Sequence, residues 1–208
     1  MLYIDKLRFW GGWWIKLTHK TVIVNKNKLP ADKVIFCANH TSNWDAVTFL
    51  ANTKYAPIFV YKKEFVKKPA FKKMLDKLGY IAVDRGEADI GAIKKSLTAL
   101  KNGNSMFIFP EGTRNFDSSE FLPFKEGAVM LSIMTKTPIC PMFFWHKKNK
   151  KGKVKGLTYI VVGDLISFDK YYGQKPTHES LCDATEALKK AITELKEYFE
   201  RDFLPKIK

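Results

Sequence analysis

The sequence has few cysteines, and their spacing excludes a cysteine-based scaffold. Only Cys37, Cys140 and Cys182 occur among 208 residues, without a CxxC or CxxH pair. An odd number of widely spaced cysteines does not favour a disulfide framework or a zinc site. We therefore expect neither disulfides nor a bound metal, and a reducing cytosol suits the chain best.

The sequence also lacks the run of about 20 apolar residues that crosses a bilayer. The N-terminus has no small-residue cleavage pattern, so neither a transmembrane helix nor a signal peptide is expected. The short uncharged stretch 9–15 lies within a segment rich in tryptophan and basic residues: Trp10, Trp13, Trp14, Lys6, Arg8, Lys16 and Lys20. This composition favours an amphipathic interfacial segment over residues 1–20, on the cytoplasmic face of a membrane. The alternative is a first helix packed on the domain.

Acidic residues are scarce relative to basic ones. Lys and Arg total 36 against 21 Asp and Glu, which gives a formal net charge of +15. Such a balance implies an anionic partner: nucleic acid, an acidic membrane surface or a phosphorylated small molecule. Hydrophobic residues make up 46% of the chain, enough for a core, and no Gly/Ser-rich linker or internal repeat divides it. Residues 21–208 are therefore predicted to form one domain.

Short runs of β-branched and aromatic residues alternate with helical patterns along the chain. The predicted strands are Thr21–Val24, Val34–Cys37, Pro57–Tyr61, Tyr80–Val83, Met106–Phe109, Ile139–Phe144 and Thr158–Val162. The predicted helices are Trp44–Asn52, Phe65–Leu78, Ile90–Lys101, Lys125–Lys136 and His178–Phe203, the last with Thr177 as its N-cap. This order predicts a single α/β domain with a mostly parallel, roughly seven-stranded sheet flanked by helices, after a short N-terminal helix. In such sheets ligands bind beyond the carboxyl ends of the strands.

The segment CANHTSNWDA, residues 37–46, follows one of these predicted strands. It places His40 at the carboxyl end of the strand and Asp45 in the first turn of the next helix. A carboxylate that accepts a hydrogen bond from one imidazole nitrogen fixes the tautomer and leaves the other nitrogen as a general base. Taken alone, the pair also fits a plainer role, in which Asp45 favours the helix N-terminus and His40 is a satisfied polar residue.

Three further segments place polar residues at neighbouring strand ends. They are FPEGTR at 109–114, GYIAVDR at 79–85 and YKKEF at 61–65. In the first, Pro110 and Gly112 predict a tight turn. Cations gathered at one edge of a sheet are what a phosphate monoester requires, and arginine can bind it through two nitrogens. Singly, each arginine would be an ordinary surface ion pair.

Together these segments resemble the glycerolipid acyltransferase family, in particular the 1-acylglycerol-3-phosphate acyltransferases. The resemblance covers roughly residues 34–142, and its signatures occur in family order: NHTSNWD, KE followed by a proline, GYIAVDR, FPEGTR, FKEGA and TPICPM. It implies His40 as general base and Asp45 as its orienting partner. The residues that it implies for the acceptor are Arg85, Arg114 and Lys63 for the phosphate, with Lys62 as the alternative to Lys63, and Glu111, Gly112 and Thr113 for the pocket.

The reaction that the resemblance implies is direct acyl transfer from a thioester to an alcohol. His40 would deprotonate the free hydroxyl of a lysophosphatidate-like acceptor, which then attacks the thioester of acyl-carrier protein or acyl-CoA. No metal or other cofactor is expected. Backbone N–H groups near His40 are candidate oxyanion donors. Glycerol-3-phosphate or another lysolipid would use much the same residues.

Parts of the sequence are also compatible with other functions. Cys37 could form an acyl-enzyme, but a cysteine inside a strand is usually an inert core residue. A metal site from His40, Asp45, Asp84 and Glu111 matches no known ligand spacing. A catalytically silent lipid-binding relative is a third alternative.

The lysines and aromatics of residues 61–80 would also suit nucleic acid. Their helical spacing favours instead a core face, including Phe71 and Leu75, opposite a lysine face that docks anionic lipid or an acidic carrier protein. A nucleic-acid binder has no use for the His40 and Asp45 pair, so nucleic acid is not the expected partner. The segment 146–156, HKKNKKGKVKG, is interpreted as a solvated surface loop.

Overall fold

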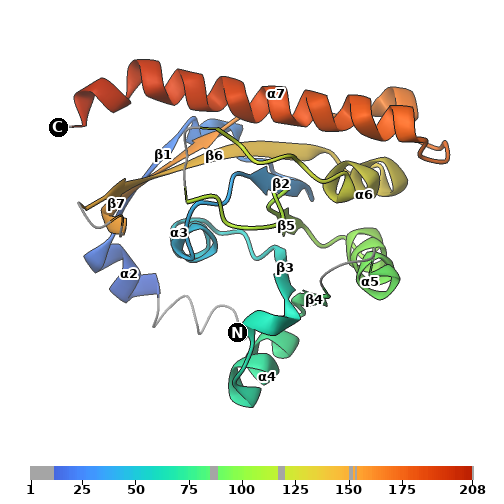
Figure 1. Ribbon diagram of the computed structural model, residues 1–208, viewed down its shortest axis with the longest axis horizontal. Helices are drawn as coiled ribbons and strands as arrows, with labels where there is room; N and C mark the ends of the chain where they lie inside the picture. Colours follow the sequence, from blue (N-terminus) through green and yellow to red (C-terminus); the bar gives the residue numbers. More distant parts are fainter. Residues whose placement is uncertain (1–11, 85–88, 117–119, 150–151, 153, 208) are drawn as a thin grey trace.

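The computed structural model describes residues 12–84, 89–116, 120–149, 152 and 154–207 (Figure 1). A seven-stranded sheet runs through the molecule in the order β1-β7-β6-β2-β5-β3-β4. The strands are β1 Lys20–Val24, β2 Ile35–Ala38, β3 Ile58–Lys62, β4 Ile81–Val83, β5 Met106–Ile108, β6 Ile139–Lys148 and β7 Val154–Val162. The α/β fold with a mostly parallel sheet that the sequence predicts is therefore confirmed.

Strand direction decides which residues meet at each edge of the sheet. The five strands β6, β2, β5, β3 and β4 run parallel to one another. β7 is antiparallel to β6, and β1 is parallel to β7, so this pair runs in the opposite direction. The carboxyl ends of β2, β5, β3 and β4 therefore lie at the same edge as the beginning of β1.

Helices cover both faces of the sheet. The helices are α2 Trp13–Thr18, α3 Trp44–Asn52, α4 Pro69–Lys77, α5 Ile90–Lys101, α6 Gly127–Thr135 and α7 His178–Asp202. Helices α5, α6 and α7 pack with Ile35 and Cys37 of β2 on one face, whereas α3 packs with Phe36 and Ala38 on the other. Figure 1 shows α7 lying along one side of the sheet, with α3 across the strands from it. Because both faces are covered, β2 is apolar at every position.

The C-terminal helix matches its prediction closely. Thr177 caps α7 by accepting a hydrogen bond from the Ser180 N–H, and the Ser180 side chain accepts one in return from the Thr177 N–H. The apolar stripe at helical spacing is turned toward the sheet, with Leu188, Ile192 and Phe199 fully buried. This helix therefore forms by its own capping and by burial of one continuous face.

Two predictions fail in detail. The segment 146–156 is not a surface loop throughout: its first residues continue β6 to Lys148, its last begin β7, and His146 is buried. Phe71 on α4 is exposed rather than part of the core, while Leu75 of the same helix is buried. The error at 146–156 has a physical cause, since an antiparallel hairpin needs no hydrophobic run when lysines occupy its exposed end.

The N-terminal helix α2 exposes its large apolar side chains. Trp13, Trp14 and Leu17 are 65%, 59% and 65% exposed, respectively. The His19 ring, just after the helix, stacks on Trp44 of α3 at 4.3 Å between ring centroids. Trp10 lies outside the described residues. Across the part of the chain that the structure describes, no helix combines the length and the apolar character needed to cross a membrane.

Candidate active site

The candidate site lies where β2 ends and α3 begins. His40 follows the last residue of β2 by two positions, and the FPEGTR turn follows the neighbouring strand β5. Lys63 and Asp84 follow β3 and β4, the next strands in the sheet. The parallel sheet therefore collects these segments along one edge, as the sequence predicts. Arg85 lies outside the described residues, so its place at this edge stays a prediction.

The His40 and Asp45 side chains meet directly. His40 Nδ1 lies 2.7 Å from Asp45 Oδ2, and the imidazole is 20% exposed while the carboxylate is fully buried. The same Oδ2 accepts hydrogen bonds from the backbone N–H groups of Thr41 at 2.9 Å and Ser42 at 3.0 Å. Asp45 therefore closes the turn that carries His40, because Oδ2 contacts the His40 side chain and also accepts from the main chain of the two residues that follow it.

A second histidine contacts the other oxygen of the same carboxylate. His146 Nε2 donates to Asp45 Oδ1, and His146 Nδ1 lies 2.7 Å from the Thr158 hydroxyl on β7. Sequence reasoning missed this residue. Alternation along β6 was the available signal, since His146 shares a face with the buried Phe144. Because β6 continues beyond the end of β2, His146 stands beside the residues that follow β2.

The hydrogen bonds determine the protonation state of this group. Burial alone would raise the pKa of Asp45, but the hydrogen bonds from His146 and His40 outweigh it, and the pKa lies below its ordinary value. A carboxylate can only accept, so the His40 nitrogen that faces it, Nδ1, carries a proton. In a neutral imidazole, His40 Nε2 then keeps its lone pair, and it has no hydrogen-bond partner within the described part of the chain.

The main chain of His40 is held from the FPEGTR side. Its N–H donates to Glu111 Oε1 at 2.8 Å, and its carbonyl accepts from the Asn115 N–H at 2.6 Å. The second Glu111 oxygen accepts from the Leu122 N–H at 3.1 Å. The His40 ring stacks on Phe109 at 4.0 Å. Glu111 is thus buried, and its carboxylate holds the loop that carries His40. Its role in the acceptor pocket stays a prediction.

The one basic residue of the FPEGTR turn, Arg114, contacts the same loop. Arg114 Nη1 donates to Asn43 Oδ1 at 2.8 Å, directly before α3. Gly112 has φ +64°, a conformation that favours glycine, and a Cβ there would lie 3.0 Å from Lys125 Cε. Lys125 therefore adds a cation at this turn that sequence reasoning did not single out. Thr113 is exposed beside it.

Lys63 lies farther along the same edge. Its ammonium forms an ion pair with Asp84, the residue just after β4. Both side chains are more than half exposed, so the pair is open to exchange with another anion. Whether Lys62 or Lys63 faces a phosphate stays open, since Lys62 ends β3 and Lys63 follows it.

Two other candidates lose support from the geometry. Cys37 is completely buried, and burial raises the pKa of its thiol far above the ordinary range, so it does not form the thiolate that a nucleophile requires. The N–H groups of His40, Thr41 and Ser42 already donate to carboxylates. The oxyanion donors expected near His40 therefore need to be other groups.

Comparison with known proteins gives a consistent result. The family described as Acyltransferase matches residues 20–145. The chain is 32% identical to a Bacillus subtilis 1-acyl-sn-glycerol-3-phosphate acyltransferase over 180 residues, 83% of this chain and 86% of the relative. It is 30% identical to the Limnanthes alba protein of the same name over 64% of this chain, which spans about half, 48%, of that relative. The fold resembles the crystal structure of a 1-acyl-sn-glycerophosphate acyltransferase from Thermotoga maritima, with TM-score 0.67 and 24% identity over 93% of this chain and 78% of that one.

The contact between His146 and Asp45 yields a pH-dependent prediction. His146→Phe keeps an aromatic ring but removes one hydrogen bond from a buried carboxylate, so the free energy of unfolding at pH 7 should fall by about 2 kcal/mol. In the wild type the lowered pKa of Asp45 gives stability that is lost only as the pH falls below about 4. In the variant, fewer hydrogen bonds offset the burial of the Asp45 carboxylate, so the pKa of Asp45 should rise. Protonation of Asp45 at low pH then removes the buried charge.

The difference in unfolding free energy between the two proteins should therefore shrink as the pH falls from 7 toward 4, as measured by urea unfolding. His146→Gln can still donate a hydrogen bond from its amide and should recover much of the stability. A difference that stays constant with pH would show that His146 acts through packing alone.

Proposed function

This chain belongs to the acyltransferase family, and we propose that it transfers a fatty acyl group from acyl-carrier protein or acyl-CoA to the free hydroxyl of lysophosphatidate in phospholipid biosynthesis. It is an O-acyltransferase. The observation that carries the proposal is the His40–Asp45 hydrogen bond of 2.7 Å at the sheet edge where Arg114 also lies. The names of its relatives support the acceptor.

In the proposed reaction His40 Nε2 takes the proton of the acceptor hydroxyl. The alkoxide oxygen forms a bond to the thioester carbonyl carbon, and the carbon–sulfur bond then breaks. The departing thiolate recovers the proton from His40, so an ester and a thiol are the products. Asp45 stabilises the imidazolium that forms in between. No metal or cofactor takes part in these steps, because the proton moves between side chain and substrates.

Asp45 acts here as a positioning residue with a fixed orientation. His146 and the Thr41 and Ser42 N–H groups hold its carboxylate, so it cannot turn away from His40. The stacking of His40 on Phe109 restrains the ring itself. A base held in this way loses little conformational entropy when the acceptor binds. This saving of entropy is a large part of the rate enhancement that comes from proximity.

The acceptor phosphate is proposed to bind along the edge next to His40. Arg114, Lys63 and Arg85 are the candidates from the sequence, and Lys125 lies against Gly112 of the same turn. A phosphate monoester carries more charge than the carboxylate of Asp84 and can replace it on Lys63. The pocket residues Glu111, Gly112 and Thr113 would shape the space between this phosphate and His40.

The membrane surface is the proposed source of the acceptor. Trp13, Trp14 and Leu17 expose apolar surface on α2, and Lys16 and Lys20 are exposed close by. The chain as a whole has a net charge of +15, and helix α2 fits an anionic bilayer surface on the cytoplasmic face, where the protein would lie peripherally. Helix α2 also lies at the edge of the sheet that carries His40. The boundary between residues 1–20 and the domain 21–208 is part of this proposal.

Other acceptors and a non-catalytic role are the alternatives. Glycerol-3-phosphate and other lysolipids present the same hydroxyl and would use the same base. A basic lipid- or nucleic-acid-binding module would bind anions without needing the His40–Asp45 contact. Turnover separates these alternatives, because only an enzyme releases thiol.

The first test of the proposal is a thiol-release assay with purified protein. Each acceptor, lysophosphatidate or glycerol-3-phosphate, is paired with acyl-CoA or acyl-carrier protein. Release should require lysophosphatidate, and His40→Ala should reduce kcat by about 10²- to 10⁴-fold with unchanged unfolding. His178→Ala is the matched control, since it removes an exposed histidine at the start of α7, which packs on the face of the sheet opposite α3. Thiol release only with glycerol-3-phosphate would identify that compound as the acceptor in place of lysophosphatidate. Equal turnover by His40→Ala and the wild type would show that His40 is not the base.

The phosphate assignment gives a second prediction. Arg114→Ala should raise the apparent KM for the phosphorylated acceptor about tenfold, or about 1.4 kcal/mol, because a charge-assisted contact is lost. The KM for the acyl donor should stay constant. Arg201→Ala is the control, since this arginine lies at the end of α7 and pairs with Asp202. An effect on the donor KM alone would contradict the assignment.

The membrane assignment is tested by sedimentation with vesicles. Replacing both Trp13 and Trp14 with alanine should weaken binding to anionic phospholipid vesicles about tenfold or more, because two exposed rings no longer enter the interface. Binding should also weaken with added salt. Leu165→Ala is the control, since it removes an exposed apolar side chain that follows β7, at the opposite edge. Equal vesicle binding by the wild type, the double variant and Leu165→Ala would show that α2 packs on the domain and does not bind the membrane.

A further inference from the structure

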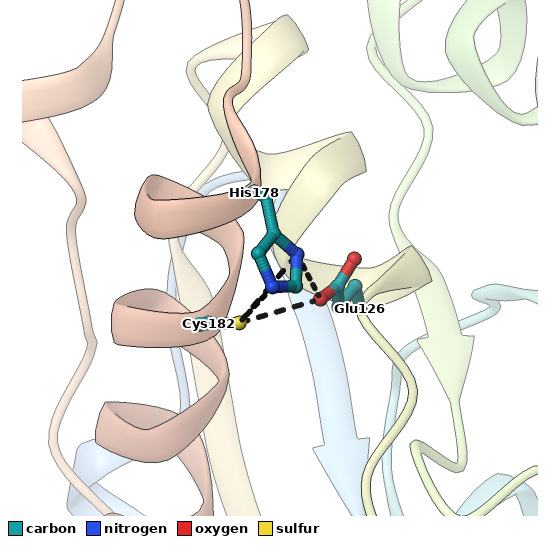
Figure 2. Close-up of side chains that lie close together, drawn as sticks. All are labelled: Glu126, His178 and Cys182. Carbon is teal, nitrogen blue, oxygen red and sulfur yellow. Dashed lines mark hydrogen bonds and ion pairs between the residues drawn. The ribbon is translucent and has the colours of Figure 1, made fainter.

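A group of potential metal ligands lies away from the acyl-transfer site, where α6 and α7 begin. Figure 2 shows that the side chains of Glu126, His178 and Cys182 converge. Glu126 directly precedes α6, His178 is the first residue of α7, and Cys182 lies one turn later on the same face. Three different side chains from two elements therefore point at one position.

With His178 Nδ1 as the nitrogen ligand, the three ligand atoms are nearly equally spaced. Cys182 Sγ lies 3.7 Å from Glu126 Oε1, and His178 Nδ1 lies 3.8 Å from both of these atoms. All the ligand atoms lie within 4.8 Å of one another. A triangle of this size has room for one ion at its centre or just above it.

These separations approach those of a tetrahedral zinc site. Zinc binds sulfur at about 2.3 Å and nitrogen or oxygen at about 2.0–2.1 Å, which places tetrahedral ligands about 3.3–3.6 Å from one another. The observed separations exceed these by only a few tenths of an ångström. All three side chains lie at the surface and can close this difference by small rotations.

We propose that Glu126, His178 and Cys182 bind one zinc ion, with a water molecule or another small ligand in the fourth position. A set of one thiolate, one imidazole and one carboxylate is suited to zinc, whereas magnesium and calcium select oxygen ligands. Binding replaces the Cys182 thiol proton, which passes to solvent. This inference does not depend on the proposed acyl transfer.

A dication between Cys182 and Glu126 would stabilise the Cys182 thiolate beside the carboxylate, because both negative groups would then be attracted to the ion.

The site would connect two helices that share the core of one face. Glu126 precedes α6 and the other two ligands begin α7, and both helices pack against the face of the sheet opposite α3. Bound zinc would restrain the first turn of α7 against α6, while His40 lies across the sheet. The expected consequence is added stability at this corner with unchanged acyl transfer. Sequence spacing did not reveal the site, because Glu126 is 56 positions from Cys182.

Cobalt substitution and zinc titration test the inference directly. Full-length protein titrated with Co²⁺ should give a near-ultraviolet thiolate-to-cobalt band and the strong visible bands of a tetrahedral ion, at one ion per chain. Zn²⁺ should displace the cobalt. Cys37 and Cys140 are buried, so Cys182 is the thiolate that the band reports.

Variants distinguish this site from adventitious binding. Cys182→Ser should abolish the thiolate band, and Cys182→Ser and His178→Ala should each weaken zinc binding about tenfold or more. Glu194→Gln, which changes a carboxylate elsewhere on α7, should bind zinc as the wild type does. Absence of the thiolate band, or equal zinc affinity in Cys182→Ser, would overturn the proposal.

Discussion

The buried carboxylate of Asp45 is the group on which the site depends. Its two oxygens accept four hydrogen bonds, from the His40 and His146 rings and from the Thr41 and Ser42 N–H groups. A buried carboxylate is costly unless its lone pairs are satisfied, and here the partners come from β6 and from the loop after β2, which carries the candidate base. The need to satisfy one charge therefore draws β6, this loop and the first turn of α3 into a single geometry. The position of His40 follows from that geometry.

The loop that carries His40 is also restrained at its main chain. Asn39 exchanges two hydrogen bonds with the Phe144 backbone, of 3.0 Å and 2.7 Å, which ties the loop to β6. On the other side Glu111 and Asn115 bind the His40 N–H and carbonyl. A loop usually has freedom that a catalytic group has to lose on binding. Here that freedom is removed during folding, so the geometry of the candidate base is set before a substrate arrives.

Contacts between residues that are close in the sequence could be predicted from the sequence. His40 and Asp45 lie five positions apart across a strand-to-helix turn, so their contact follows from spacing alone. The contact between His146 and Asp45 spans 101 positions and depends on how far β6 continues beyond β2, which lysine-rich residues 147–155 conceal. Phe71 fits a helical stripe, yet its side chain is exposed among the described residues. The core and the edge of the sheet were thus predictable from the sequence. Contacts that depend on the length of a strand, or on which helix covers a given residue, could be seen only in the structure.

Strand direction connects the site to the proposed membrane surface. If β1 ran parallel to β2, the helix before it would lie at the opposite edge, far from His40. The reversed β1–β7 pair instead returns α2 to the edge where His40 lies, and the stacking of His19 on Trp44 fastens it one residue from Asp45. A lysolipid has a phosphate, a hydroxyl and an apolar chain within one molecule. Under the proposed function, the cations beside FPEGTR, the candidate base His40 and the tryptophans of α2 present matching chemistry along one edge. A lysolipid acceptor would then reach His40 without its apolar chain having to cross water.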